Sequence, residues 1–183
     1  MDETFAQDYE VDQLTELPGH PEEAHYYYPG GMVDGGGDGV LVRVRRRQRP
    51  IWLGTFAFGK LGSRGVTGIY ATPNPRKLCV VGKGAGYFVS VDDPSNWEEV
   101  RVEPILDVRG IPSTSLMIFA DFTRMIAHGP EGLCWETERL SWDGFEITEV
   151  CGSTIEGRCR KPGSDDVVRF GVDLDTGEVR AHP

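Results

Sequence analysis

The chain has 183 residues and a formal net charge of −10, and 39% of its residues are hydrophobic. This length suits one ordinary domain of roughly 100 to 150 residues plus an extension, and it excludes two full-sized domains. No stretch approaches the roughly 20 apolar residues of a membrane helix, and the first residues lack the cationic start and apolar run of a signal peptide. We therefore expect a cytoplasmic protein without a membrane partner.

The net charge comes entirely from the first 39 residues. Residues 1–39 contain ten acidic residues and no Lys or Arg, whereas residues 40–183 contain 19 acidic and 19 basic residues. Self-repulsion and a glycine-rich run before residue 40 predict that residues 1–39 form a disordered acidic tail and linker, followed by a single domain over residues 40–183. The tyrosines at 26–28 are the only large apolar feature of the linker that ends this tail, and they either stay solvated or dock on the domain or on a partner.

From Gly39 onward the sequence consists of short runs rich in Val, Ile, Phe, Tyr and Trp, each closed by Gly, Pro, Asn, Asp or Ser. Such runs are typical of β-strands, and no ten-residue window has the spacing of an amphipathic helix. The predicted strands cover residues 40–46, 51–58, 65–71, 77–82, 86–91, 97–102, 105–109, 115–120, 124–128, 133–138, 144–150, 153–160, 166–173 and 178–181. The predicted fold is all-β, built from antiparallel meanders.

Similar residues recur at an offset of 38 positions over part of this region. The pairs are Leu78 and Leu116, Tyr87 and Met125, and Trp97 and Trp135. Over residues 65–181 this pattern resembles the blade repeats of β-propellers, whose units have four strands and about 40 to 45 residues. The resemblance implies two or three blade-like units, of which the third runs from Phe145 to Val179. Because a closed ring takes about four to eight blades, the alternatives are a sandwich-like stack, a partial propeller or a ring completed as a homo-oligomer.

Motifs for metals and cofactors are incomplete. The four cysteines, Cys79, Cys134, Cys151 and Cys159, include no CxxC pair, which argues against a zinc site. The segment 54–61 nearly matches a phosphate-binding loop, but Leu61 stands where the motif needs Ser or Thr. The carboxylates of 173–178 fit a strand-turn-strand sequence better than a calcium loop. We therefore predict neither a metal nor a cofactor.

The leading functional hypothesis is a non-enzymatic binding module whose partner is another protein, because no catalytic constellation is complete and tryptophans near turns often anchor partner chains. The candidate binding residues are Trp97, Trp135, Trp142, Asp121, Arg124, His128 and Asp143.

Two alternatives stay open. One is a hydrolase or lyase with a carboxylate and histidine site around Asp121, His128 and Glu136. The other is nucleic-acid binding through a cationic run, because such affinity begins with local positive charge. That run could instead face water on an edge strand or fold back on the acids of the tail. Its members are Arg43, Arg45, Arg46, Arg47 and Arg49.

Overall fold

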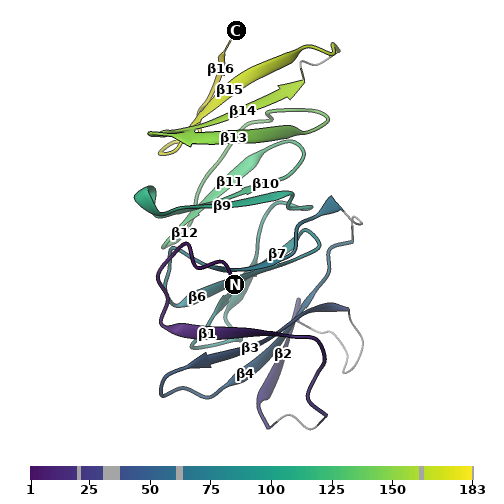
Figure 1. Ribbon diagram of the computed structural model, residues 1–183, viewed down its shortest axis with the longest axis vertical. Helices are drawn as coiled ribbons and strands as arrows, with labels where there is room; N and C mark the ends of the chain where they lie inside the picture. The colour runs from purple at the N-terminus through teal and green to yellow at the C-terminus, as the bar shows by residue number, and fades with distance from the viewer. Residues whose placement is uncertain (20–21, 31–37, 61–63, 161–162, 183) are drawn as a thin grey trace. The chain divides into compact units, whose positions relative to one another are not determined.

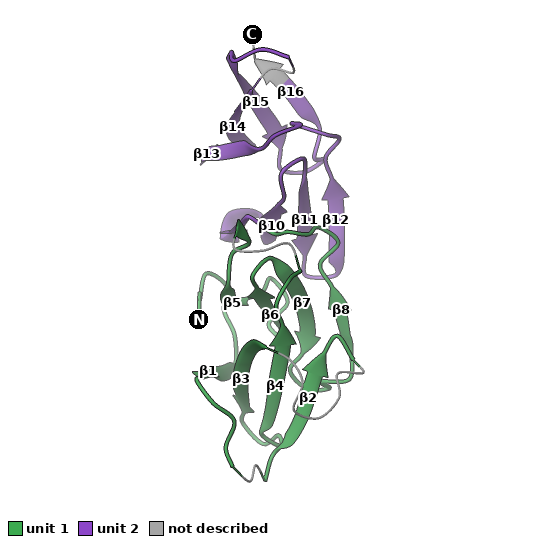
Figure 2. Cartoon of the chain, turned by 90° about the vertical axis from the view of Figure 1, so that its right-hand side faces the viewer, with its two compact units in different colours: residues 1–105 green, residues 106–183 purple. Residues whose placement is uncertain are grey.

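The computed structural model describes residues 1–19, 22–30, 38–60, 64–160 and 163–182 (Figure 1). These residues form sixteen β-strands and no α-helix, which confirms the predicted all-β class. They group into two compact units, residues 1–105 and 106–183 (Figure 2). The prediction that residues 40–183 act as one domain stays a prediction.

Unit 1, residues 1–105, contains two four-stranded sheets with the strand orders β1-β3-β4-β2 and β5-β6-β7-β8. Neighbouring strands are antiparallel, except that β2 runs parallel to β4. The strands are β1 (Tyr9–Leu14), β2 (Ala24–Tyr28), β3 (Gly39–Arg46), β4 (Trp52–Ala57), β5 (Gly68–Ala71), β6 (Lys77–Gly82), β7 (Ala85–Ser90) and β8 (Trp97–Glu99).

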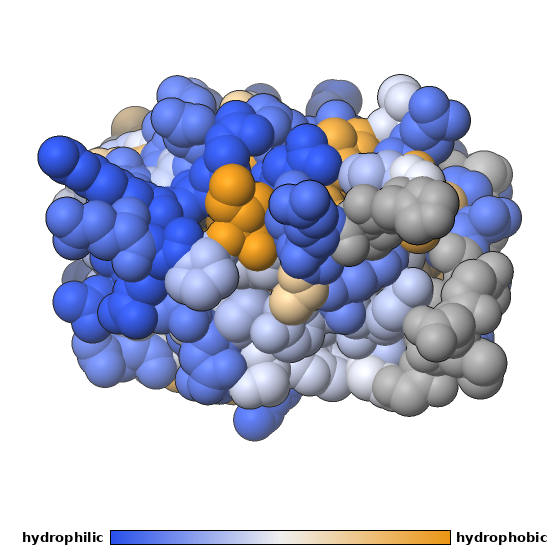
Figure 3. Space-filling view, turned by 90° about the horizontal axis from the view of Figure 1, so that it is seen from below, coloured by the Kyte–Doolittle hydropathy of each residue, from blue (hydrophilic) through white to orange (hydrophobic). Residues whose placement is uncertain are grey.

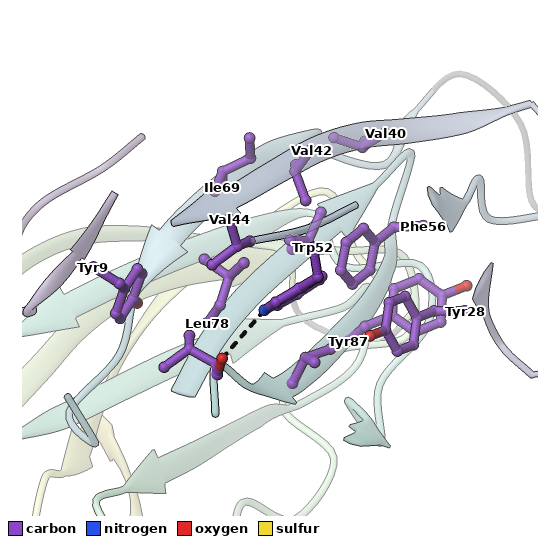
Figure 4. Close-up of a cluster of buried hydrophobic side chains, with 13 residues drawn as sticks. Tyr9, Tyr28, Val40, Val42, Val44, Trp52, Phe56, Ile69, Leu78 and Tyr87 are labelled. Atoms are coloured by element: carbon purple, nitrogen blue, oxygen red, sulfur yellow. Dashed lines mark hydrogen bonds between the residues drawn. The ribbon is translucent and has the colours of Figure 1, made fainter. Parts of the chain in front are cut away.

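The core of unit 1 lies between these two sheets, as the side chains drawn in Figure 4 illustrate. Alternate residues of β3 point inward because successive side chains of a strand face opposite sides of the sheet. The side chains of Trp52 and Phe56 on β4 belong to the same cluster. The indole Nε1–H of Trp52 donates to the main-chain oxygen of Val91 at 3.2 Å, the bond that Figure 4 draws as a dashed line. This bond joins β4 to the residue that directly follows β7.

Unit 2, residues 106–183, also contains two four-stranded antiparallel sheets, and both follow the order of the chain. The strands of the first are β9 (Asp107–Ile111), β10 (Leu116–Ala120), β11 (Met125–Gly129) and β12 (Gly132–Glu136), with a 3-10 turn, η2 (Pro112–Thr114), between β9 and β10. Those of the second are β13 (Phe145–Cys151), β14 (Thr154–Arg160), β15 (Val167–Asp173) and β16 (Val179–His182).

A tryptophan again joins the two sheets of unit 2. Trp135 on β12 belongs to the core cluster, and its Nε1–H donates to the main-chain oxygen of Leu174 at 2.7 Å. Its ring lies against Gly177, where an added Cβ would come within 2.8 Å of the indole and where φ is +74°. Only glycine tolerates both the close approach and this backbone conformation. The sequence Asp-Thr-Gly at 175–177 therefore serves as the turn between β15 and β16, which the sequence predicted.

The predicted strands from residue 40 onward agree with the structure, because each of the fourteen segments overlaps one observed strand, with ends that differ by up to three residues. The connection between β6 and β7 is a two-residue turn whose residues, Lys83 and Gly84, both have positive φ. The pairs offset by 38 residues fall on strands that hold the same position in consecutive sheets, namely β6 and β10, β7 and β11, and β8 and β12.

The expected disorder of residues 1–39 is not supported. Strands β1 and β2 belong to the first sheet. The amide of Asp2 donates to the oxygen of Ile69 on β5, and the oxygen of Asp2 accepts from the amide of Ala71 on the same strand. Tyr9 and Tyr28 are buried in the core of unit 1. The glycine-rich residues 31–37 lie outside the described residues. Composition failed here because four of the ten acids are paired with arginines of β3, which reduces the self-repulsion on which the expectation depended. These acids are Asp8, Glu10, Asp12 and Glu23.

We predict that Tyr28→Ala lowers the free energy of unfolding by about 3–5 kcal/mol, as for other large aromatic truncations in cores. Tyr28 is 1% exposed, its ring stacks on Phe56 at 4.4 Å, and its hydroxyl donates to the main-chain oxygen of Pro94. The control is Tyr27→Ala, because Tyr27 is only half-buried, and it should cost less than about 1 kcal/mol. Urea unfolding measures both; equal small losses would mean that β2 is not part of the folded unit.

We predict that Trp135→Phe costs about 2–4 kcal/mol, because it removes the indole donor, leaves the oxygen of Leu174 without it and opens a cavity. Trp142→Phe is the matched control, since Trp142 is 70% exposed, and it should change stability by less than about 0.5 kcal/mol. Urea unfolding followed by circular dichroism compares the two variants. If they lose the same amount, the inter-sheet hydrogen bond is not a stabilising contact.

Candidate binding site

The loop between β12 and β13, residues 137–144, is fixed to the rest of unit 2 by backbone bonds. The amide of Thr137 donates to the oxygen of Met125, and the amide of Leu140 donates to the oxygen of Thr123. Ser141 is 2% exposed and its hydroxyl donates to the oxygen of Gly144 at 2.7 Å. The loop thus holds a defined conformation, because hydrogen bonds fix the residues before Trp142 and connect Ser141 to Gly144 on its other side.

Trp142 projects from this anchored loop. Its side chain is 70% exposed, the largest exposure among the exposed large hydrophobic residues that the structure describes. The guanidinium of Arg139 lies 4.2 Å from the centre of the indole ring, a cation–π contact. Tryptophan and arginine are the residue types most enriched at the energetic centres of protein interfaces. The sequence had singled out Trp142 but not Arg139.

A shallow hollow of about 410 Å³ adjoins this loop through Asp143 and Gly144. Its apolar wall comes from β13, β14 and β15 of the second sheet, from the residue before β9 and from the turn between β10 and β11. Val167, at one side, is 62% exposed. Burial, together with the charge of Asp143, raises the pKa of the Cys159 thiol, which keeps the thiol protonated at neutral pH. The apolar and sulfur-containing side chains are Leu106, Phe122, Phe145, Cys159 and Val167.

Asp121, Arg124 and Glu136 meet beside the same loop. Asp121 accepts from the amides of Thr123 and Arg124 at 2.6 and 2.8 Å, which closes the turn between β10 and β11. The guanidinium of Arg124 pairs with Glu136 and lies 3.7 Å from Asp121. These three predicted residues therefore lie together. Their hydrogen bonds and ion pairs order the turn between β10 and β11, in which the oxygen of Thr123 accepts from the amide of Leu140.

His128 is not part of this group. It lies on β11, is 4% exposed, and its ring packs edge-on against Phe119 with the centroids 5.9 Å apart. In the pairing of β10 and β11 it stands opposite Met117, at the far end of β11 from Arg124. The geometry thus gives no support to a site in which His128 acts together with Asp121 and Glu136, and that alternative stays a prediction.

Trp97 and Trp135 contribute mainly to the cores. Trp135 is 7% exposed, and Trp97 is a partly buried member of the unit 1 cluster, where it packs against Tyr28 and Tyr87. Of the three tryptophans proposed for binding, only Trp142 presents most of its surface to solvent.

The arginines of β3 are covered by acids of the N-terminal segment. Because β3 lies between β1 and β4, the hypothesis of an edge strand is wrong. The alternative in which the run folds back on the acids agrees with the structure for Arg43, Arg45 and Arg46, whereas Arg49 lies beside Asp92. Figure 3, seen from below the view of Figure 1, shows hydrophilic side chains around a small hydrophobic group. Arg43 pairs with Glu23, Arg45 with Glu10 and Asp12, and Arg46 with Asp8.

The thiols differ in accessibility. Cys79 is buried, and burial raises its pKa well above the ordinary value, whereas Cys134 and Cys151 are exposed. Within the described ranges of the chain, no three His, Cys, Asp or Glu side chains come together in a way that could hold a metal ion.

Comparison with protein-family models finds no matching family, and comparison with curated proteins finds no match. Among the described residues, no helix has the length and apolar character needed to cross a membrane.

Proposed function

We propose that the protein is a non-enzymatic binding module that recognises another protein in the cytoplasm through a surface centred on Trp142. The observation that carries this proposal is the 70% exposure of that side chain on a loop fixed by hydrogen bonds. Exposing a large apolar ring to water is unfavourable by about 1.5–3 kcal/mol relative to burying it. A partner that covers the ring recovers this free energy without first having to order the loop.

The surroundings of Trp142 support a protein partner over a small molecule. The adjoining hollow is shallow and mixes apolar side chains with the charges of Asp143, Glu146 and Arg158. Small-molecule sites are concave and bury most of their ligand, whereas protein interfaces combine a hydrophobic centre with a polar rim. Arg139 supplies a planar cation that can donate hydrogen bonds to a carboxylate of the partner while it stays stacked on the indole.

The sheets β5–β8 and β9–β12 are consistent with two blade-like units, because their strands recur with the 38-residue offset seen in the sequence. Such folds serve many unrelated functions, so the fold supports a scaffold role and the loop supports the binding role. A second copy of this chain is one partner that the same surface could take, and the mass in solution tests it directly.

We predict that Trp142→Ala abolishes retention of the partner while the protein stays folded. The exposed cation–π contact is worth about 0.5–1 kcal/mol, so its loss should not unfold unit 2. The tagged full chain, the Trp142→Ala variant and the matched control Ile51→Ala are compared by quantitative mass spectrometry of complexes from the native host. Ile51 is an apolar residue of unit 1 that is 39% exposed.

We expect at least one protein that the wild type and Ile51→Ala both retain, and whose retained amount falls tenfold or more with Trp142→Ala. Alternatively, a concentration-dependent increase in mass that Trp142→Ala removes would identify the partner as a second copy. Retention of the same proteins at the same levels by all three forms, or the absence of both retention and self-association, would contradict the proposal.

A further inference from the structure

A second hollow, which is polar, lies in unit 1 at the turn between β3 and β4, apart from the surface centred on Trp142. It has a volume of about 590 Å³ and is lined by residues from four separate parts of the chain. The lining residues are Asp8, Arg46, Arg47, Gln48, Arg49, Arg76 and Asp92.

The hollow carries a net positive charge. Its four guanidiniums and two carboxylates leave a charge of +2. Arg47 and Arg76 are exposed, and neither lies within ion-pairing distance of a carboxylate of any residue that the structure describes. Two guanidiniums thus remain available to a ligand, each with an edge of N–H donors that fits two oxygens of a phosphate group.

The other two arginines are held in place by Asp92. The carboxylate of Asp92 pairs with Arg46 and lies 3.3 Å from Nε of Arg49, and Arg46 is also 2.6 Å from Asp8. The paired Arg46 guanidinium lowers the pKa of Asp92, so this carboxylate stays charged at neutral pH. The arginine side chains are therefore oriented before a ligand arrives, which reduces the entropy lost on binding.

The backbone around Asp92 is fixed by the same bond that joins the two sheets. The amide of Val91 donates to the oxygen of Arg76 at 2.9 Å, and the oxygen of Val91 accepts the indole N–H of Trp52. On the opposite side, the amide of Arg49 donates to the oxygen of Arg46 at 3.1 Å and closes the turn. Gln48 in that turn has φ +61°, which is uncommon for a residue other than glycine.

The charge distribution favours a single phosphate group over a nucleic acid. The remaining arginines of β3, Arg43 and Arg45, are paired with acids, so no uncovered basic stripe continues from the hollow along β3. Residues 1–105 contain 15 acidic and 11 basic residues, so a long polyanion would meet net repulsion outside the hollow. A phosphate monoester carries a charge of about −1.5 to −2 at neutral pH, which matches the hollow.

We propose that the hollow of Arg46, Arg47, Arg49 and Arg76 binds a phosphate monoester dianion, carried either by a small molecule or by a phosphorylated side chain. Arg47 and Arg76 supply the direct contacts to the phosphate. Arg46 and Arg49, which Asp92 orients, make the electrostatic potential of the hollow more positive. The site lies in unit 1, so it is independent of the surface around Trp142, and either proposal can fail without the other.

Isothermal titration calorimetry of the full chain with phenyl phosphate, at about 0.15 M NaCl so that exposed charges are screened, tests the proposal. We expect saturable binding at one site that weakens at least tenfold in Arg47→Gln and in Arg76→Gln. Lys83→Gln is the control, since Lys83 is an exposed cation that follows β6 whereas Arg76 precedes it. Lys83→Gln and Trp142→Ala should leave the affinity unchanged, and circular dichroism verifies that every variant is folded.

Further titrations with a phosphoserine peptide, its unphosphorylated form and a single-stranded oligonucleotide identify the source of the phosphate. Tighter binding of the phosphopeptide than of phenyl phosphate would support a phosphorylated side chain, and equal binding would support a small molecule. Absence of saturable phenyl phosphate binding, or equal weakening in Lys83→Gln, would overturn the proposal. So would an oligonucleotide that binds more tightly than both phosphate probes with an affinity that falls steeply with salt.

Discussion

Both units of this chain depend on one interaction, a buried indole N–H that donates to a main-chain oxygen of the neighbouring sheet. Trp52 reaches Val91 in unit 1 and Trp135 reaches Leu174 in unit 2, and each acceptor directly follows the third strand of its sheet. Packed sheets lie about 10 Å apart, a gap that an indole can fill, but its N–H must find a partner there. The bond therefore fixes how each pair of sheets is aligned.

In unit 1 this constraint also supports the hollow that we propose for phosphate binding. In unit 1 the oxygen of Val91 accepts from Trp52, and Asp92 follows at once, where it orients two arginines. In unit 2 a separate set of backbone bonds joins the loop of Trp142 to the turn between β10 and β11. Rigid supports reduce the entropy that binding would otherwise cost, so the same contacts contribute to stability and to recognition.

The sequence predicted the strands after residue 40 well because short β-branched and aromatic runs between turn residues depend on local chemistry alone. It failed for β1 and β2 because Glu10 meets Arg45 across 35 positions, a pairing that composition cannot reveal. Burial likewise separates Trp142 from Trp97 and Trp135, although the three are equivalent as residue types. Arg76 and Asp92 could not be associated with Arg46 for the same reason, because they come from other turns and only the packing of the two sheets brings them together.

Hydrogen exchange of the indole N–H groups, followed by nuclear magnetic resonance, tests most directly whether these bonds join the sheets. A buried, bonded N–H exchanges only when the surrounding structure opens, whereas an exposed one exchanges freely. Trp52 and Trp135 should therefore exchange far more slowly than Trp142, with protection close to that of the core amides of β6 and β10. Exchange of Trp52 and Trp135 at the rate of Trp142 would contradict the account.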